Sequence, residues 1–219
     1  MHFLYERLRW LGIPASAMLR LPSSVDPIRF QQVTKNLSAD DDLWIQLLPA
    51  EALAEWRTKI AAGQPRIILY VGTLTLSHHP VDLLLQAFAQ LARDREDCRL
   101  LLVGGGADLL TLQAMAQTLG IAERCCFVGR VPPAVAPYFF HVADLSVDPV
   151  HDDLAAQARW PLKIVESLAA GLPVVTGAIG DRAEMLGNGA AGRLVQPERG
   201  RIWLRRWVKS LTILYYTKQ

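Results

Sequence analysis

From residue 66 onward, short apolar runs alternate with longer segments whose apolar side chains recur every three or four residues. The apolar runs are nearly continuous, which is typical of strands covered on both faces of a parallel sheet. They predict strands at residues 67–71, 99–103, 126–128, 145–147, 173–176 and 193–195.

Helices are predicted between these strands. In the first helical segment, Leu84, Ala87, Phe88 and Leu91 fall on one face. Strands that alternate with helices predict an α/β fold built on a doubly wound, Rossmann-like parallel sheet. Ligands of such sheets bind at the carboxyl ends of the strands, where loops meet helix N-termini. The predicted helices lie near residues 81–93, 108–119, 133–142, 161–170 and 182–186.

The two ends of the chain follow other patterns. Before residue 66 we expect a short helix at residues 3–10, a strand at 18–21, a solvated polar loop at 31–42 and a helix at 49–63. Residues 203–216 are expected to form a basic amphipathic helix. We therefore divide the chain into residues 1–65, 66–198 and 199–219.

Composition narrows the class of protein. A membrane span needs about 18 consecutive apolar residues, and no stretch of the 219 residues is that long. The first residues also lack the architecture of a signal peptide. Three cysteines cannot form a disulfide framework. The adjacent Cys125 and Cys126 open a predicted strand and point to opposite faces, so we expect both to pack in the core. These features predict a cytoplasmic protein.

The net charge of +2 is unevenly distributed. Residues 199–219 contribute +6, which leaves −4 on the rest of the chain. An acidic body argues against a nucleic-acid partner. The basic terminal segment could instead make a peripheral contact with an anionic membrane, associate with a second copy or pack on the chain itself.

Four loops follow the predicted strands at the ligand-binding edge. The first, residues 72–79, leads to a helix that begins near Pro80, and the third is centred on Gly129. The second loop contains Gly104, Gly105 and Gly106, and its sequence fits neither the G-x-G-x-x-G motif nor a P-loop. Each of these three loops could contact a ligand, or it could be an ordinary turn between a strand and a helix. The fourth loop contains Asp148, His151, Asp152 and Asp153, which could be drawn as a metal site. We do not favour a metal site because further ligands at fixed spacing are lacking.

Lys163 and Glu166 lie three residues apart in the first turns of the helix after the fourth loop. The lysine would bring a positive charge to the strand ends. The glutamate could accept two hydrogen bonds from a vicinal diol such as that of ribose. An exposed ion pair between the two side chains is the alternative interpretation.

The segment around these two residues resembles a known family. PLKIVESLAAGLPVV (residues 161–175) is similar to the donor-site helix of the group 1, retaining nucleotide-sugar glycosyltransferases of the GT-B fold. Further resemblance, in order along the chain, is carried by LPSSVDPIRF (21–30), ILYVGTL (68–74), VDLLLQAF (81–88), LLVGGG (101–106), FVG (127–129), ADL (143–145) and GDRAEMLGNGAAGRLV (180–195).

The resemblance implies two Rossmann-like domains, of which the C-terminal one binds the donor and the N-terminal one the acceptor. Residues 66–198 would be the donor domain, and residues 1–65 the last piece of the acceptor domain plus the hinge. Transfer would proceed with retention at the anomeric carbon, without a metal or cofactor. The family's catalytic histidine belongs to the missing part, so no catalytic residue is assigned. The residues implied to bind the donor are Gly72, Thr73, His79, Gly129, Arg130, Val131, Trp160, Pro161, Leu162, Lys163, Glu166, Gly180 and Asp181.

The sequence departs from the family pattern at three positions. Ala158 replaces a glutamate, and Thr73 and His79 replace an arginine and a lysine that face the diphosphate. These losses keep a second hypothesis open, a non-catalytic module that binds a nucleotide or a partner protein, such as an N-terminal half on another chain. A dinucleotide oxidoreductase is a third hypothesis, which the absent glycine fingerprint disfavours. The base, the sugar and the acceptor are not specified by the sequence.

Overall fold

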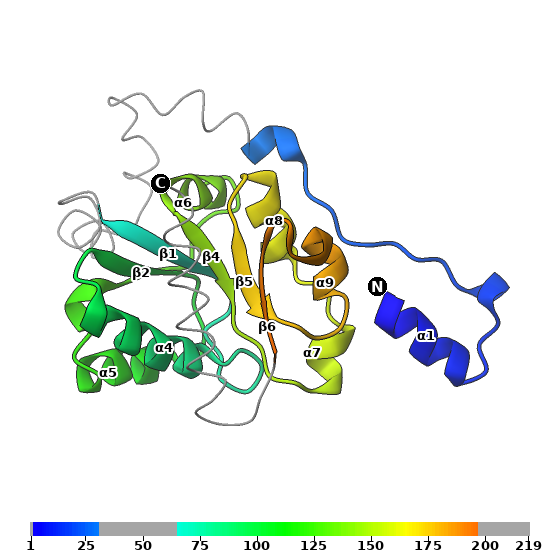
Figure 1. Cartoon of the computed structure of the whole chain (residues 1–219), viewed down its shortest axis with the longest axis horizontal. Helices are drawn as coiled ribbons and strands as arrows, with labels where there is room; N and C mark the ends of the chain where they lie inside the picture. Colours follow the sequence, from blue (N-terminus) through cyan, green and yellow to red (C-terminus); the bar gives the residue numbers. More distant parts are fainter. Residues whose placement is uncertain (1, 31–64, 197–219) are drawn as a thin grey trace.

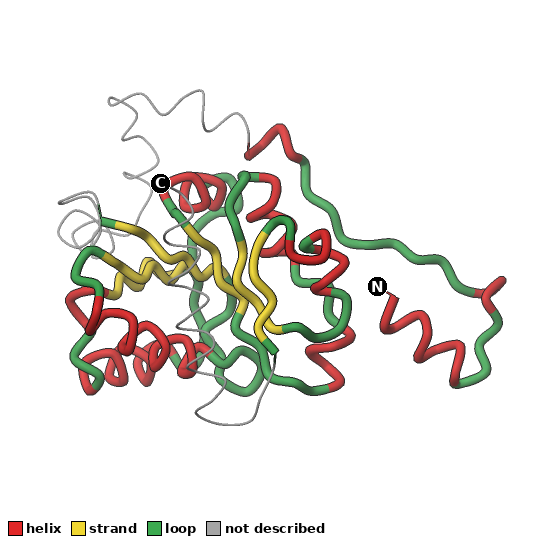
Figure 2. Tube along the Cα trace, in the orientation of Figure 1, coloured by secondary structure: helices red, strands yellow, loops and turns green. Residues whose placement is uncertain are grey.

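A computed structural model describes residues 2–30 and 65–196. These residues form one parallel sheet of six strands in the order β3-β2-β1-β4-β5-β6, with helices between successive strands (Figures 1 and 2). The α/β, Rossmann-like fold predicted from the sequence is therefore confirmed. The strands are β1 (Arg66–Val71), β2 (Cys98–Val103), β3 (Cys125–Gly129), β4 (Leu145–Asp148), β5 (Val174–Gly177) and β6 (Gly192–Val195).

The helices agree with the periodic segments to within a few residues. Pro80 and Pro161, expected in the first turns, occupy the N-cap positions of α4 and α8. The helices are α1 (His2–Trp10), α4 (Val81–Asp94), α5 (Leu109–Thr118), α6 (Ala136–Val142), α7 (Leu154–Ala158), α8 (Leu162–Ala169) and α9 (Arg182–Met185), with 3-10 turns η1 (Ala15–Ala17), η4 (Ala122–Arg124) and η5 (Gly187–Gly189).

Alternate side chains of the central strands pack into two separate cores. Ile68 and Tyr70 of β1 face a cluster with α4 and α5, whereas Ile67 and Leu69 face a cluster with α6. Successive strand residues point to opposite faces, so a strand covered by helices on both sides must be apolar throughout. Cys125 and Cys126 divide between the two cores in the same way, as expected.

The segment before the sheet is held by a few contacts. Phe30 is buried against the ring of Phe140 on α6, and Arg29 donates a hydrogen bond to the carbonyl of Pro133. His141 contacts the carbonyl oxygen of Phe30, so this histidine has a polar partner within the fold. Residues 25–30 are thereby attached to the α6 side of the sheet, and α1 lies at the α7 edge (Figure 1).

One expected strand is wrong. Residues 18–21 are not in a strand, and Leu19 is 80% exposed. Apolar side chains here have no neighbouring strand to pair with, and a strand is stable only when its backbone is paired. The helices expected at residues 49–63 and 203–216 lie outside the described residues. Among the described helices, none has the length and hydropathy needed to cross a membrane.

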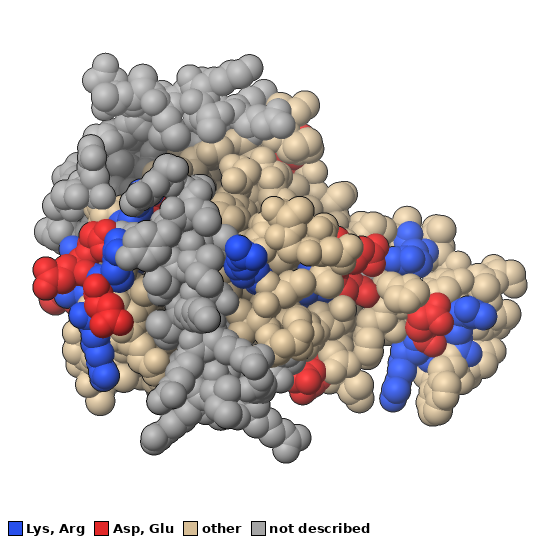
Figure 3. All heavy atoms as spheres, in the orientation of Figure 1, with Lys and Arg blue, Asp and Glu red and all other residues tan. Residues whose placement is uncertain are grey.

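Charged side chains are mixed over the visible surface. In Figure 3, basic and acidic side chains of the described residues lie close to one another at both ends of the molecule rather than forming a large patch of one sign. Arg20 and Glu184, for example, form an exposed ion pair of 3.4 Å between the N-terminal segment and α9.

Candidate nucleotide site at the carboxyl edge of the sheet

A cavity of about 290 Å³ lies at the carboxyl ends of β1 and β4, beside the N-terminus of α8. This is the edge where parallel sheets bind ligands. The cavity is lined by the end of β1 and its loop, the end of β4 and the start of α8. Its lining residues are Val71, Gly72, Thr73, His79, Asp148, Pro149, Val150, Arg159, Pro161, Leu162, Lys163, Glu166 and Arg182.

Glycines bring the first two loops into close backbone contact at this edge. A side chain added at Gly104 would place its Cβ 1.9 Å from the carbonyl oxygen of Gly72. At Gly106 the Cβ would lie 2.2 Å from the carbonyl oxygen of Leu74. Two of the three glycines after β2 therefore serve to pack the second loop on the first. At Gly72, a Cβ would reach 3.1 Å from Lys163 Nζ, so this glycine leaves room for the lysine.

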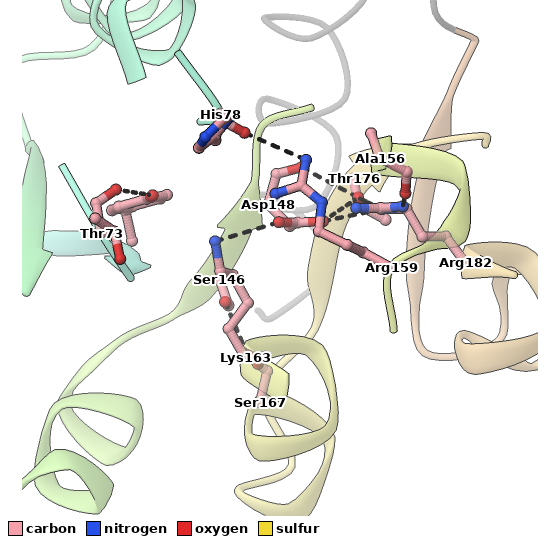
Figure 4. A network of polar contacts seen from close by, with 11 residues as sticks. Thr73, His78, Ser146, Asp148, Ala156, Arg159, Lys163, Ser167, Thr176 and Arg182 are labelled. Atoms are coloured by element: carbon pink, nitrogen blue, oxygen red, sulfur yellow. Dashed lines mark hydrogen bonds and ion pairs between the residues drawn. The ribbon is translucent and has the colours of Figure 1, made fainter. Parts of the chain in front are cut away.

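Asp148 is the centre of a buried polar network beneath the cavity (Figure 4). Its Oδ2 accepts hydrogen bonds from Arg182 Nε at 2.9 Å and from Thr176 Oγ1 at 2.9 Å. Its Oδ1 lies 3.3 Å from Lys163 Nζ. Burial by itself raises the pKa of Asp148, but the charges of Lys163 and Arg182 and these hydrogen bonds hold the pKa below its ordinary value. The carboxylate is therefore ionised at neutral pH.

The Lys163 side chain is largely buried and contacts Asp148 and Tyr70. Its side chain is 11% exposed, and its Nζ lies 4.5 Å from the centre of the Tyr70 ring. Desolvation lowers its pKa, while Asp148 opposes that change. Nζ makes the ion pair with Asp148 but no well-aligned hydrogen bond. The ammonium group thus keeps donor capacity for a ligand in the cavity.

Burial disfavours the charged forms of the His79 and Glu166 side chains. Burial, Lys163 and Arg159 lower the pKa of His79 to about 4, so its imidazole is neutral at pH 7. Desolvation raises the pKa of Glu166, and the charges of Arg29 and Lys163 partly offset this effect. No ion pair between Lys163 and Glu166 is present in the structure, so the alternative of an exposed pair is wrong.

The structure brings only part of the expected donor-binding set to the cavity. Gly129, Arg130 and Val131 follow β3 and do not line it; Arg130 is exposed and lies over Gly105. Trp160 lies between lining residues without lining the cavity itself. Gly180 packs on the carbonyl of Gln157 of α7, and Asp181 accepts a hydrogen bond from the backbone N–H of Phe3 at 2.8 Å. The expected residues that do line the cavity are Gly72, Thr73, His79, Pro161, Leu162, Lys163 and Glu166.

Three charged residues of the site were missed or misinterpreted from the sequence. Asp148 was weighed only as a metal ligand, and Arg159 and Arg182 were not singled out. An acid at the end of an apolar strand is a usable signal, because a buried carboxylate must have a partner. The partner itself, Arg182, lies 34 residues away and could not be identified by spacing.

Two acids of the fourth loop make hydrogen bonds to residues of α7. Asp153 accepts a hydrogen bond from the N–H of Ala156 at 2.7 Å and caps α7. Asp152 accepts one from the Gln157 side chain at 2.7 Å. Within residues 2–30 and 65–196, no three histidine, cysteine, aspartate or glutamate side chains are grouped as a metal site would require.

Comparisons with known proteins agree with this architecture. In sequence, the chain is 32% identical over 195 residues to a GDP-mannose-dependent alpha-(1-6)-phosphatidylinositol monomannoside mannosyltransferase of Mycolicibacterium smegmatis, a match that covers 87% of the chain and 47% of that relative. It is 31% identical to a D-inositol 3-phosphate glycosyltransferase of Nocardia farcinica, over 69% of the chain and 34% of the relative. In structure, it is similar to Anabaena HepE in complex with UDP, with a TM-score of 0.64 and 17% sequence identity. That match covers 96% of this chain and 50% of the HepE chain.

The chain spans about half the length, or less, of the relatives that it matches. Within it, residues 54–202 match the family model of glycosyl transferases group 1, which is well over half of the chain. The match contains the whole cavity, from the end of β1 to Arg182. The chain therefore belongs to the group 1 glycosyl transferases.

Proposed function

We propose that this chain binds the nucleoside diphosphate part of a nucleotide-sugar donor and forms the donor-binding half of a glycosyltransferase. The observation that carries the proposal is the convergence of Lys163, Glu166 and the loop after β1 on one cavity at the carboxyl edge of the sheet. Glu166 would accept hydrogen bonds from the ribose hydroxyls. Gly72, Thr73 and Lys163 would line the diphosphate.

The cavity supplies the chemistry that a departing diphosphate needs. Negative charge grows on the leaving group as the glycosidic bond to the sugar breaks. Lys163 and the backbone N–H groups in the first turn of α8 would stabilise that charge without any rearrangement at the moment of reaction. We propose transfer that needs no metal, with retention at the anomeric carbon as the sequence resemblance implies.

The relatives narrow the donor to be tested first. A relative that is 32% identical is named as GDP-mannose-dependent, so GDP-mannose is the first candidate donor. Both kinds of relative carry inositol in the names of their acceptors, which makes an inositol-containing acceptor the first to try. Binding of the acceptor would require a second half, which we assign to the part of the relatives that this chain does not cover.

Thermal melts of the chain with GDP, UDP, ADP and GDP-mannose test donor binding. A ligand at 100 times its dissociation constant stabilises a fold by about 2.7 kcal/mol, which raises the Tm of a domain of this size by several degrees. We expect such a rise with at least one of the diphosphates, and the same rise in EDTA. No shift with any of them would contradict donor binding, and a shift abolished by EDTA would contradict the metal-free part.

A further inference from the structure

Arg159 connects the two loops that face each other across the cavity. It is the C-cap residue of α7, where the backbone turns to an extended conformation before α8 begins. From there its Nη2 donates a hydrogen bond to the carbonyl oxygen of His78 at 3.2 Å, in the loop after β1 (Figure 4). Arg159 and the loop after β1 both line the cavity.

The positive charge of Arg159 is not neutralised by its surroundings. Asp148 pairs with Lys163 and with Arg182. No described carboxylate lies within 4 Å of the Arg159 guanidinium, and its buried Nε has no hydrogen-bond partner among the described residues. A buried donor without a partner costs free energy. A ligand with acceptor oxygens in the cavity would meet this uncompensated positive charge.

The loop after β1 brings no permanent positive charge of its own. Its histidine at the cavity, His79, is neutral at pH 7 because burial, Lys163 and Arg159 lower its pKa to about 4. Lys163 approaches the cavity from α8. A diphosphate has two phosphoryl groups. If one of them contacts Lys163, the other would face Arg159.

We propose that Arg159 binds oxygens of the donor diphosphate and positions it as a leaving group; this inference rests on the proposed function. The planar guanidinium can donate two parallel hydrogen bonds to one phosphoryl group, which a lysine cannot do. The bond to the His78 carbonyl orients that plane, and Nε has no partner among the described residues. Arg159 thus replaces, from the opposite loop, the positive charge that Thr73 and His79 do not supply.

The test compares Arg159→Gln with the unmodified chain by titration calorimetry. The probes are the nucleoside and the nucleoside diphosphate of the base that binds best. We expect the variant to lose roughly 10- to 150-fold in affinity for the diphosphate, as for a hydrogen bond to a charged group, and to bind the nucleoside unchanged. Arg159→Lys, which keeps the charge without the fork, should lose less.

The matched control is Arg93→Gln, which removes an exposed arginine in the last turn of α4, outside the cavity. It should leave both affinities unchanged. The ratio of the two affinities is measured within each variant, so a uniform loss of folded protein cancels. If Arg159→Gln does not fold, the ratio in Arg159→Lys decides, and an unchanged ratio there overturns the inference.

The two proposals fail in different ways. If the unmodified chain binds no nucleoside diphosphate, the proposed function is contradicted. If the chain binds the diphosphate and Arg159→Gln binds it as tightly, only the role of Arg159 is overturned. Equal losses for nucleoside and diphosphate would also overturn it, because they would mean a general structural effect.

Discussion

Asp148 and Arg182 form an ion pair that is almost completely removed from solvent. The Nε–Oδ2 distance is 2.9 Å, and the two side chains are 4% and 2% exposed. Arg182 also donates a hydrogen bond to the carbonyl of Ala156 at 2.9 Å. The pair thereby ties the end of β4 to the start of α9 and to α7. Since Lys163 also contacts Asp148, the same carboxylate fixes the position of the lysine in the cavity.

The substitution Asp148→Asn tests this arrangement. An asparagine side chain would keep the shape but leave Lys163 and Arg182 buried without a negative charge. We expect the free energy of unfolding to fall by about 3–5 kcal/mol, as when one partner of a buried pair is removed. Urea denaturation measures this loss. Asp94→Asn, at the exposed end of α4, should cost less than about 0.5 kcal/mol. Equal stability of the two variants would contradict the central role of Asp148.

The glycines after β2 provide a second, sterically matched comparison. Gly104→Ala would force a Cβ to within 1.9 Å of the Gly72 carbonyl oxygen, at a φ of +136° that favours glycine. We expect a loss of more than about 2 kcal/mol in stability. In Gly105→Ala the new Cβ meets the exposed Arg130 side chain, which can rotate away, so the cost should be small. A tolerated Gly104→Ala in thermal melts would show that the two loops do not depend on this contact.

The fold was predictable because its signals are local. A strand covered on both faces must be apolar throughout, so β1, at residues 66–71, could be located without knowing its neighbours. Residues 18–21 carry a similar local signal and form no strand, because pairing depends on a partner that the local sequence does not specify. The order of the strands in the sheet was not predicted and is known from the structure.

The site was predictable only where its residues follow one another in the chain. Lys163 and Glu166 share one helix, so their spacing showed that both reach the same edge. Arg182 lies beyond β5 in the chain, 34 residues from Asp148, and Arg159 contacts His78 across 81 residues. Neither contact has a signature in spacing. Gly129, Arg130 and Val131 were expected beside the donor, and whether a bound base reaches them stays a prediction.

Glu166→Gln tests the proposed contact with ribose. The carboxylate is partly desolvated and makes no ion pair with Lys163, so the loss of its charge should cost the ligand-free protein little. If Glu166 accepts two hydrogen bonds from the ribose hydroxyls, affinity for the best nucleotide should fall by about 1.5–3 kcal/mol. Titration calorimetry on this variant and on Glu123→Gln, a control outside the cavity, separates the two effects. Unchanged affinity would contradict the ribose contact.

His79 should make the stability of the ligand-free protein depend on pH. Its pKa is about 4 in the folded chain against an ordinary 6.5. Between these values the unfolded chain binds the extra proton, so stability falls as pH is lowered from 6.5 to 4 and is unaffected by His79 above 6.5. One proton gives at most about 1.4 kcal/mol per pH unit. Urea denaturation across this range should show a shallower slope in His79→Gln, but not in His151→Gln, which alters an exposed histidine outside the cavity. Parallel slopes in the unmodified chain and His79→Gln would contradict the shift.

Binding of a diphosphate should reverse the electrostatic balance at the same histidine. Burial, Lys163 and Arg159 disfavour its protonated form, while Asp148 favours it and is already paired. A diphosphate beside Thr73 and Lys163 adds negative charge, which raises the pKa of His79. At pH 5.5 we therefore expect proton uptake on binding.

GDP-mannose suits the measurement because its diphosphate, esterified at both ends, does not titrate near this pH. Calorimetry in two buffers of different ionisation enthalpy gives the number of protons taken up. That number should fall toward zero in His79→Gln and stay unchanged in His151→Gln. The same uptake in His79→Gln would mean that the proton goes elsewhere, and would place the diphosphate away from the loop after β1.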